Sequence, residues 1–308
     1  MSASASAAPF SLPRLIRDFP SLGEALKGAE RAAATDAPIL ILGEPGTGRS
    51  TVARALHAAS PRAGGPLVEV DPGAIPSTLF ESELFGYQAG AFTGAQRASE
   101  GRVAQAQAGT LVLDHVEELP LAAQPKLLRL LAERRYAPLG AAEVEADVRF
   151  LAAGAEDLPR RVERGAFRPD LFYRLEVVTF RLPPLRERRR DLPAILDHLL
   201  ADLGDRLGRP LELAAPARAW IEEHPWPGNL RQLRNVLERG AILADGRLVD
   251  PPPPEGLLDG RPRPLLEMEV ELIRHALAYT RGHQGKAAAL LGISRKALWE
   301  KRKRHGIP

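Results

Sequence analysis

The sequence lacks cysteine altogether and contains few aromatic residues. Its 308 residues include no Cys, and Phe, Trp and Tyr together make up only 5%. The absence of cysteine excludes disulfide bridges, thiolate zinc sites and a thiol nucleophile. No apolar run approaches the ~20 residues of a membrane-spanning helix. The start, M-S-A-S-A-S-A-A-P-F, lacks the basic and apolar regions of a secretory signal. We therefore expect a soluble, cytoplasmic protein with no membrane partner.

The remaining composition is that of an ordinary globular protein. Hydrophobic residues make up 44% of the chain and charged residues 26%, which argues against wholesale disorder. At ~100–200 residues per domain, a chain of this length suggests about two domains.

The small net charge of +3 is unevenly distributed. Residues 265–308 contain nine Lys and Arg against four Asp and Glu, a net charge of +5, and the other 264 residues contain 33 against 35, a net charge of −2. A short basic end on a near-neutral body suggests a nucleic-acid contact. A solvated helix face or a charged tail has the same composition, so charge alone leaves both interpretations open.

The hydrophobic pattern divides the chain into four parts. Alternating apolar runs and helical patterns predict an α/β domain with a mostly parallel sheet over residues 21–249, of which about 188–249 form a small helical subdomain. Residues 1–20 are rich in Ser, Ala and Pro, and we expect a disordered tail. Four consecutive prolines mark a linker over 250–264, because proline cannot continue a helix. Helical spacing returns over 265–308.

The elements expected within the α/β part are short. Strands are predicted at 38–42, 67–70, 110–113 and 148–152, and helices at 50–59, 193–207 and 231–244.

A glycine-rich turn lies between the first predicted strand and the first predicted helix. It reads G-E-P-G-T-G-R-S, from Gly43 to Ser50. Backbone N–H groups and a helix N-terminus at such a turn attract phosphate, and glycine lets the backbone approach it. The usual pattern has lysine where this chain has Arg49. A generic strand-to-helix turn is the alternative interpretation. The candidate phosphate-binding residues are Gly43, Glu44, Pro45, Gly46, Thr47, Gly48, Arg49 and Ser50.

The basic end predicts two short helices around a glycine. A helix is expected over 285–291, then a turn at Gly292, then a second helix for which Ser294 is well placed as the N-cap. This is the pattern of a helix-turn-helix, whose second helix enters the major groove of DNA. Trp299 either packs beneath this helix or contacts DNA, and the whole segment could instead serve dimerisation. The candidate DNA-binding residues are Ser294, Arg295, Lys296, Lys301, Arg302 and Arg304.

One further segment carries a resemblance to a known family. Glu81–Ala95 reads E-S-E-L-F-G-Y-Q-A-G-A-F-T-G-A and contains G-A-F-T-G-A. A-F-R-P-D-L-F-Y-R-L, L-P-P-L-R-E-R and W-P-G-N-L-R-Q-L-R-N follow later in the chain. Together these stretches resemble the bacterial enhancer-binding proteins, which are sigma-54-dependent transcriptional regulators. The resemblance covers an AAA+ module over about 21–244 and a Fis-type helix-turn-helix at the end.

The resemblance implies a fold and a set of partners. The fold is an α/β AAA+ P-loop domain with a parallel sheet and a small helical subdomain, followed by an all-α helix-turn-helix domain. Such proteins assemble into rings, hydrolyse ATP with Mg²⁺, bind upstream enhancer-like DNA sites and engage RNA polymerase that carries sigma-54. Family members often carry an N-terminal receiver or sensory domain. Because only some 20 residues precede the AAA+ module here, we expect none in this chain.

The resemblance also implies roles for particular residues. ATP would be bound by the phosphate loop and Arg231, and Mg²⁺ would be held through water by Asp114. Arg168 and Arg174 match the arginines that reach the γ-phosphate on a neighbouring subunit, although a surface ion pair is the alternative for each. The sigma factor would be contacted by Gly90, Ala91, Phe92, Thr93, Gly94 and Ala95.

Four positions depart from the family pattern, and all four serve nucleotide or its hydrolysis. His115 stands where the family has the glutamate that polarises the attacking water, and Asp71 stands where it has asparagine. Arg49 replaces lysine, and Gly154, with Ala155 after it, replaces a polar pair. Glu117 and Glu118 lie past the end of the strand, and we do not expect either to replace the missing glutamate. A pairing of His115 with Asp71 by a hydrogen bond or an ion pair is expected.

These departures leave two functional hypotheses. In the first, the chain is a sigma-54-dependent regulator that binds DNA and ATP but hydrolyses ATP poorly. In the second, it is a non-hydrolysing DNA-binding regulator or accessory subunit that works beside an active partner ATPase. Slow hydrolysis supported by His115 and Asp71 is a variant of the first hypothesis. A general AAA+ unfoldase is disfavoured by the sigma-factor loop and the DNA-binding end.

Overall fold

The computed structural model describes residues 10–244, 248–249, 269–270, 272–274, 276–277, 280, 283–305 and 307. The chain divides into two compact units, residues 1–253 and 254–308, and each is described by itself. Across the described residues, no helix combines the length and the apolar character needed to cross a membrane.

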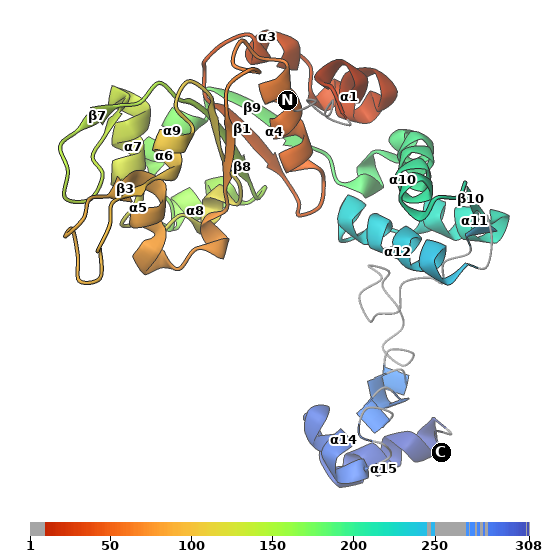
Figure 1. Ribbon diagram of the computed structural model, residues 1–308. Helices are drawn as coiled ribbons and strands as arrows, with labels where there is room; N and C mark the ends of the chain where they lie inside the picture. Colours follow the sequence, from red (N-terminus) through yellow and green to blue (C-terminus); the bar gives the residue numbers. More distant parts are fainter. Residues whose placement is uncertain are drawn as a thin grey trace. The chain divides into compact units, whose positions relative to one another are not determined.

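The first unit is built on a sheet of five parallel strands (Figure 1). Their order is β2 (Leu67–Val70), β5 (Thr110–Leu113), β8 (Arg149–Gly154), β1 (Ile39–Gly43) and β9 (Val178–Leu182). Every residue of β1, β5 and β8 is buried, as expected for the central strands of a sheet covered on both faces. This arrangement confirms the predicted α/β fold with a parallel sheet.

The four predicted strands are confirmed, but a fifth was not predicted. β9 reads V-T-F-R-L, and only its third and fifth residues are buried. It lies at the edge of the sheet beside β1. An edge strand with a half-exposed pattern gives a weaker apolar signal than the buried central strands.

Two hydrophobic layers enclose the sheet. Ile39 and Ile41 of β1 face one layer, and Leu40 and Leu42 face the other, because successive side chains of a strand point to opposite faces. The helices around the sheet are α3 (Ala29–Ala33), α4 (Arg49–Ala58), α5 (Ser77–Phe85), α6 (Arg102–Gln105), α7 (Gln124–Glu133), α8 (Leu158–Glu163) and α9 (Pro169–Leu175). The first layer holds side chains of α3 and α4, and the second holds side chains of α5 to α9.

The prediction of a disordered tail over residues 1–20 is wrong where the structure describes that segment. Instead, Leu12–Asp18 form helix α1 and Pro20–Ala25 form helix α2. Leu12 and Leu15 are buried in the first hydrophobic layer. The prediction rested on the Ser- and Ala-rich composition of the first ten residues and missed the apolar residues at helical spacing that follow them. Residues 1–9 lie outside the described part of the chain.

The small helical subdomain follows β9. It consists of α10 (Leu192–Leu207), α11 (Ala215–Glu223), α12 (Asn229–Leu243) and a short parallel pair, β10 (Glu212–Leu213) with β11 (Leu248–Val249). The helices predicted at 193–207 and 231–244 are confirmed to within two residues at either end. Trp226 is fully buried in the same hydrophobic layer as Leu233 of α12, so the subdomain shares a core with the face of the sheet that α4 covers.

In the second unit, all the regular secondary structure among the described residues is helical. Those residues described between 269 and 277 are helical, and α14 (Gln284–Leu290) and α15 (Arg295–Arg304) follow. Ile273, Leu277, Ala287, Leu298 and Ile307 form a small core of their own. The linker predicted at 250–264 lies outside the described residues, as do several residues between 265 and 282, where helical spacing was predicted.

The role of α1 in the core can be tested by truncating a buried leucine. Leu15 is 3% exposed, and Leu15→Ala should lower the free energy of unfolding by about 3 kcal/mol because it leaves a cavity. Leu243→Ala removes the same atoms from a side chain that is 70% exposed and should cost less than about 0.5 kcal/mol. Urea unfolding followed by circular dichroism measures both, and equal small losses would contradict a folded N-terminal segment.

Candidate functional site

The predicted phosphate loop lines a pocket of about 390 Å³ at the end of β1. The loop residues on the pocket wall are Gly46, Thr47, Gly48, Arg49 and Ser50, and Arg231 joins them from α12. Gly43, Glu44 and Pro45 belong to the loop without lining the pocket. Gly46 has φ +81°, and a Cβ atom there would lie 2.5 Å from the Gly228 carbonyl oxygen. Glycine is required at Gly46 for both reasons.

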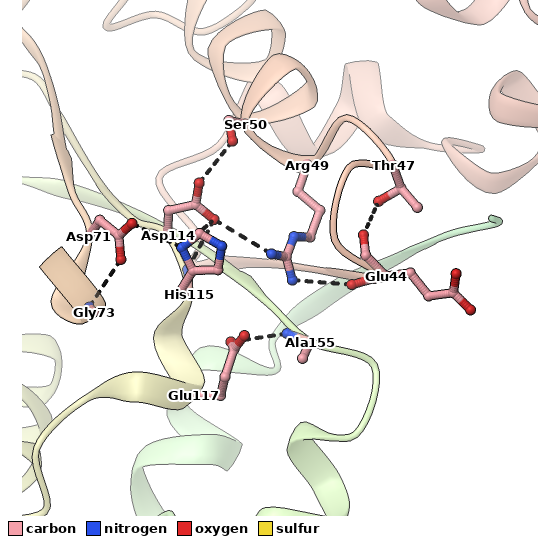
Figure 2. Close-up of polar contacts among 11 residues, drawn as sticks. Glu44, Thr47, Arg49, Ser50, Asp71, Gly73, Asp114, His115, Glu117 and Ala155 are labelled. Carbon is pink, nitrogen blue, oxygen red and sulfur yellow. Dashed lines mark hydrogen bonds and ion pairs between the residues drawn. The ribbon is translucent and has the colours of Figure 1, made fainter. Parts of the chain in front are cut away.

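Arg49 fills the base of the loop with its side chain. Its guanidinium donates a hydrogen bond of 3.1 Å to the Gly43 carbonyl oxygen and lies 4.0 Å from Asp114 Oδ1 (Figure 2). The side chain is 5% exposed. Arg49 therefore connects the loop to the end of β5, and its charge faces a carboxylate in a nearly dry environment.

Asp114 is held by three groups of this chain. The Ser50 hydroxyl donates to Oδ2 at 2.8 Å, and the His115 backbone N–H donates to Oδ1 at 2.9 Å. Arg49 is the third group. A carboxylate and a hydroxyl side by side at the end of a strand are donors suited to Mg²⁺ beside a nucleotide phosphate. Ser50 and Asp114 are therefore suited to hold such an ion.

The expected pairing of His115 with Asp71 is confirmed. His115 Nδ1 lies 3.1 Å from Asp71 Oδ2, and the other Asp71 oxygen accepts from the Gly73 backbone N–H at 3.0 Å (Figure 2). His115 has φ +48° and lines the pocket. Because Nδ1 is engaged by the carboxylate, only Nε2 is left to act on a molecule in the pocket.

Glu117 is engaged at the end of β8 and does not line the pocket. Its Oε2 accepts a hydrogen bond of 3.0 Å from the Ala155 backbone N–H, at the end of β8 (Figure 2). A Cβ atom on Gly154 would lie 2.9 Å from Val116 Cγ1 and 3.2 Å from Glu117 Oε2. The missing side chain at Gly154 therefore has a packing reason: the 3₁₀ turn η2 (Val116–Glu118) lies directly against it.

The helical subdomain clamps the phosphate loop through residues that the sequence patterns did not single out. Arg186 forms two hydrogen bonds, of 2.6 and 2.9 Å, with the Glu44 carboxylate. Asn229 donates to Glu44 Oε2 and to the Pro45 carbonyl oxygen, both at 3.1 Å, and accepts from the Leu185 backbone N–H at 2.7 Å. The hydrogen bonds from Arg186 hold the pKa of the Glu44 carboxyl below its ordinary value, and Asn229 adds to this effect.

Two further contacts extend this clamp along the loop. Arg188 donates to the Thr47 carbonyl oxygen at 2.7 Å, and the Leu230 backbone N–H donates to the Gly46 carbonyl oxygen at 3.0 Å. Burial lowers the pKa of Arg188 to about 10, so it stays charged at neutral pH. Four consecutive loop residues are thus held by the subdomain. Arg186, Arg188 and Asn229 lie within stretches of family resemblance, but only the fold shows that they meet the loop.

An apolar wall completes the pocket. Phe10, Phe19, Ile195 and Leu199 line it, and the Phe10 ring lies tilted against the His198 ring with centroids 4.3 Å apart. Because residues 1–20 were expected to be disordered, the sequence did not predict that Phe10 and Phe19 line the pocket. One side of the pocket is therefore cationic and the other aromatic and aliphatic, which suits a molecule with a charged end and a flat apolar end.

Arg168 and Arg174 do not line this pocket. Arg168 makes two hydrogen bonds with Asp170, at 3.0 and 2.7 Å, and remains half-exposed. The nearest acceptor for Arg174 is the Leu131 carbonyl oxygen, at 3.3 Å from the guanidinium. Both arginines lie at α9, beside the exposed Tyr173. Neither arginine therefore lines the pocket of its own chain.

The G-A-F-T-G-A segment forms a loop between two short antiparallel strands, β3 (Gly86–Tyr87) and β4 (Ser99–Glu100). The loop closes on itself through a hydrogen bond of 2.8 Å from the Gly90 N–H to the Ala95 carbonyl oxygen. Phe92 is 43% exposed, and its ring contacts that of Tyr87 at 5.0 Å between centroids. Ala95 is buried. The loop thus presents a partly exposed aromatic ring and Thr93 at its tip.

The second unit arranges its basic residues on two faces of α15. Ser294 caps the helix by accepting from the Ala297 N–H at 3.1 Å, which confirms the predicted cap. Arg295, Lys296, Lys303 and Arg304 are exposed. Trp299 is 54% exposed, with Lys303 Nζ 5.3 Å from its ring centroid, so it does not pack beneath the helix.

Lys301 and Arg302 lie on the other face of α15. Lys301 forms an ion pair of 2.6 Å with Glu269, which also contacts His305 Nε2 at 2.9 Å. Arg302 is half-buried. The hydrogen bond from Lys301 holds the pKa of the Glu269 carboxyl below its ordinary value. Lys301 therefore fastens α15 to the helix before α14, a role that the sequence alone did not suggest.

The sequence matches three known families in succession. Residues 15–181 match the Sigma-54 interaction domain, residues 186–252 the AAA+ ATPase lid domain, and residues 265–305 the Bacterial regulatory protein, Fis family. It is 41% identical over 306 residues to the C4-dicarboxylate transport transcriptional regulatory protein DctD of Rhizobium meliloti, covering 98% of this chain and 66% of that protein. It is 39% identical to the DNA-binding transcriptional regulator NtrC of Bradyrhizobium, covering 94% and 69%.

Solved structures agree with these matches. NtrX from Brucella abortus superposes with a TM-score of 0.71 at 33% identity, covering 96% of this chain and 71% of that one. The same protein in complex with ADP gives a TM-score of 0.70 at 34% identity, covering 92% and 67%. The chain spans about two thirds of the length of the curated relatives that it matches.

The clamp on the phosphate loop can be tested at Asn229. Asn229→Ala leaves the Leu185 N–H and the Pro45 carbonyl without their buried partner and should lower the free energy of unfolding by about 3 kcal/mol. Asn235→Ala, at an exposed position of the same helix, should cost less than about 0.5 kcal/mol. Urea unfolding of the full chain measures both. Equal midpoints for the two variants would rule out the clamp.

Proposed function

Because the chain belongs to the family of sigma-54-dependent transcriptional regulators, with a sigma-54 interaction domain, an AAA+ lid and a Fis-type helix-turn-helix, we propose that it binds ATP and hydrolyses it poorly. The observation that carries this proposal is the phosphate-loop pocket in which His115, and no glutamate, follows Asp114. The pocket has the phosphate loop of a nucleotide site, but the residue after Asp114 is not the anionic base that would polarise the attacking water.

The pocket suits a nucleotide with Mg²⁺. The N–H groups at the start of α4 and the guanidinium of Arg49 would meet the phosphates, and the apolar wall around Phe10 and Leu199 would cover the base. Arg231 would approach the phosphates from the helical subdomain. Ser50 and Asp114 would hold Mg²⁺, Asp114 through water. When bound, the ion supplies positive charge to the phosphate oxygens.

Hydrolysis is impaired because His115 is a weaker substitute for a carboxylate. A neutral imidazole carries no negative charge, and in this chain Nδ1 is already engaged by Asp71. General-base catalysis contributes ~10²- to 10⁴-fold to a rate, so its loss leaves binding in place and slows the chemical step. The relatives' ADP and ATP complexes support nucleotide binding in this chain without bearing on its rate.

The loop and the arginines at α9 serve contacts with other chains. We expect the loop from Gly90 to Ala95 to engage the sigma-54 RNA polymerase through Phe92 and Thr93. Aromatic residues, Phe among them, are enriched at protein–protein interfaces. Arg168 and Arg174 would reach the nucleotide of a neighbouring subunit in a ring, where a guanidinium stabilises the transferring phosphoryl group. That neighbour is another copy of this chain or a related active ATPase.

A second candidate function follows from the same pocket. The His115–Asp71 hydrogen bond of 3.1 Å orients the imidazole as a carboxylate does in other catalytic pairs. In that case Nε2 accepts the proton of the attacking water and the chain hydrolyses ATP slowly by itself. The two candidates differ in what removal of Asp71 does to the rate.

Phosphate release distinguishes these candidates. With the protein concentrated enough to assemble, Asp71→Asn/His115→Glu should raise phosphate release by about tenfold or more, since it restores a general base. His115→Glu alone is a weaker test because the new carboxylate would face Asp71 and be repelled. Arg49→Lys should also raise the rate of phosphate release.

Asp71→Asn alone is the matched control. If His115 is merely a weak substitute, this control should leave the slow rate unchanged. If the pair is the working base, the control should lower the rate. A wild-type turnover equal to that of the double variant would refute impaired hydrolysis.

DNA binding should depend steeply on salt. The exposed Arg295, Lys296, Lys303 and Arg304 would contact DNA, with Arg295 and Lys296 at the base edges and Lys303 and Arg304 at the phosphates. Lys303→Gln and Arg304→Gln should each reduce the slope of log K against log salt by about 1. Arg31→Gln, on the first unit, should not change it. Fluorescence anisotropy with a labelled duplex measures the slopes.

Removal of residues 265–308 should abolish DNA binding altogether. Retention of duplex binding by the shortened chain would contradict the assignment of this function to the second unit.

A further inference from the structure

Arg49 places its guanidinium beside Asp114, one of the two residues that would hold a divalent ion. Its guanidinium lies between the Gly43 carbonyl oxygen, at 3.1 Å, and Asp114 Oδ1, at 4.0 Å, and its side chain is 5% exposed. A planar guanidinium presents donors in several directions at once, whereas a lysine ammonium is a compact point charge on a flexible chain. Arg49 can therefore face the loop, the carboxylate and an incoming phosphate together.

The groups that would hold a divalent ion are already engaged by this chain. The Ser50 hydroxyl donates to Asp114 Oδ2 at 2.8 Å, and Asp114 Oδ1 accepts the His115 N–H at 2.9 Å. A metal held by Ser50 and Asp114 would share the Asp114 carboxylate with the buried positive charge of Arg49. Within the described part of the chain, no three His, Asp or Glu side chains gather where they could bind a metal ion.

The pocket supplies much positive charge of its own. Arg188, Arg231 and Arg234 line it together with Arg49, against the carboxylates of Asp114 and Asp202. Arg234 is paired with Asp202 at 3.0 Å, and Arg188 is buried with one donor on the Thr47 carbonyl. Guanidinium groups bind phosphate oxygens through charge-assisted, often bidentate hydrogen bonds. A partly buried site strengthens such bonds further.

We propose that the Arg49 guanidinium takes over the charge-neutralising role of the divalent metal, so that this chain binds nucleoside di- and triphosphates with little dependence on Mg²⁺. The inference rests on the proposed nucleotide binding. Mg²⁺ can still enter through Ser50 and Asp114, but it adds little affinity.

The test is the affinity of the full chain for ADP, measured by titration calorimetry in excess Mg²⁺ and again in excess chelator. The wild-type dissociation constants in the two conditions should agree within about threefold, because the guanidinium is covalently part of the site. Arg49→Lys should bind at least about tenfold more weakly in chelator than in Mg²⁺, because a single ammonium cannot span the loop and the carboxylate.

A second variant keeps the test informative if the lysine substitution disturbs the fold. Arg49→Gln removes the charge with a similar apolar stem and should also make binding sensitive to the chelator. Thermal unfolding of each variant verifies the fold. A wild-type protein that loses about tenfold or more of its ADP affinity in chelator would overturn the inference and leave nucleotide binding intact. No ADP binding in either condition would overturn the proposed nucleotide binding and the inference with it.

Discussion

The contact on which the first unit depends is the fully buried amide of Asn229. This one side chain joins the Leu185 backbone to the Pro45 carbonyl and the Glu44 carboxylate, so it holds the helical subdomain against the phosphate loop. Asn229 adopts φ +52°, a conformation that asparagine tolerates better than most residues. Neighbouring contacts from Arg186 and Arg188 then fix the rest of the loop. The phosphate loop and the helical subdomain therefore shape the pocket together, and residues of both line it.

At the end of β5, the charged and polar side chains differ from those of the family pattern. Asp71 and His115 form a hydrogen-bonded pair across the ends of β2 and β5, and Arg49 turns inward to Asp114. Each of these groups is satisfied by a partner from this chain, and buried or half-buried polar groups that are satisfied do not cost stability. The departures from the family pattern are thus mutually compatible rather than a set of defects, which is consistent with a site that still binds nucleotide.

The sequence predicted the fold well and the site only in part, for reasons that particular residues make clear. The central strands are continuous apolar runs, so β1, β5 and β8 were evident, whereas β9 was missed because its edge position exposes Arg181. The phosphate loop and Asp114 were found because their spacing is local. The Asn229 clamp and the contribution of Phe10 could not be found in this way, since residues 44 and 229 are joined only by the fold. Lys301 was assigned to DNA on charge alone, and only the tertiary structure shows its carboxylate partner, Glu269.

The pairing of His115 with Asp71 also determines how the pocket meets the rest of the first unit. Asp71 holds the Gly73 N–H with its second oxygen and so begins the turn η1 (Pro72–Ala74). That turn leads into α5, and α5 leads through β3 to the loop that carries Phe92. Asp71, the partner of the His115 ring, therefore lies at the start of the segment that supports the exposed loop. Because α5 is anchored by the buried side chains of Phe80, Leu84 and Phe85, this support is a packed helix rather than a flexible linker. The His115–Asp71 pair thus connects the pocket lining to the start of the segment that supports the loop.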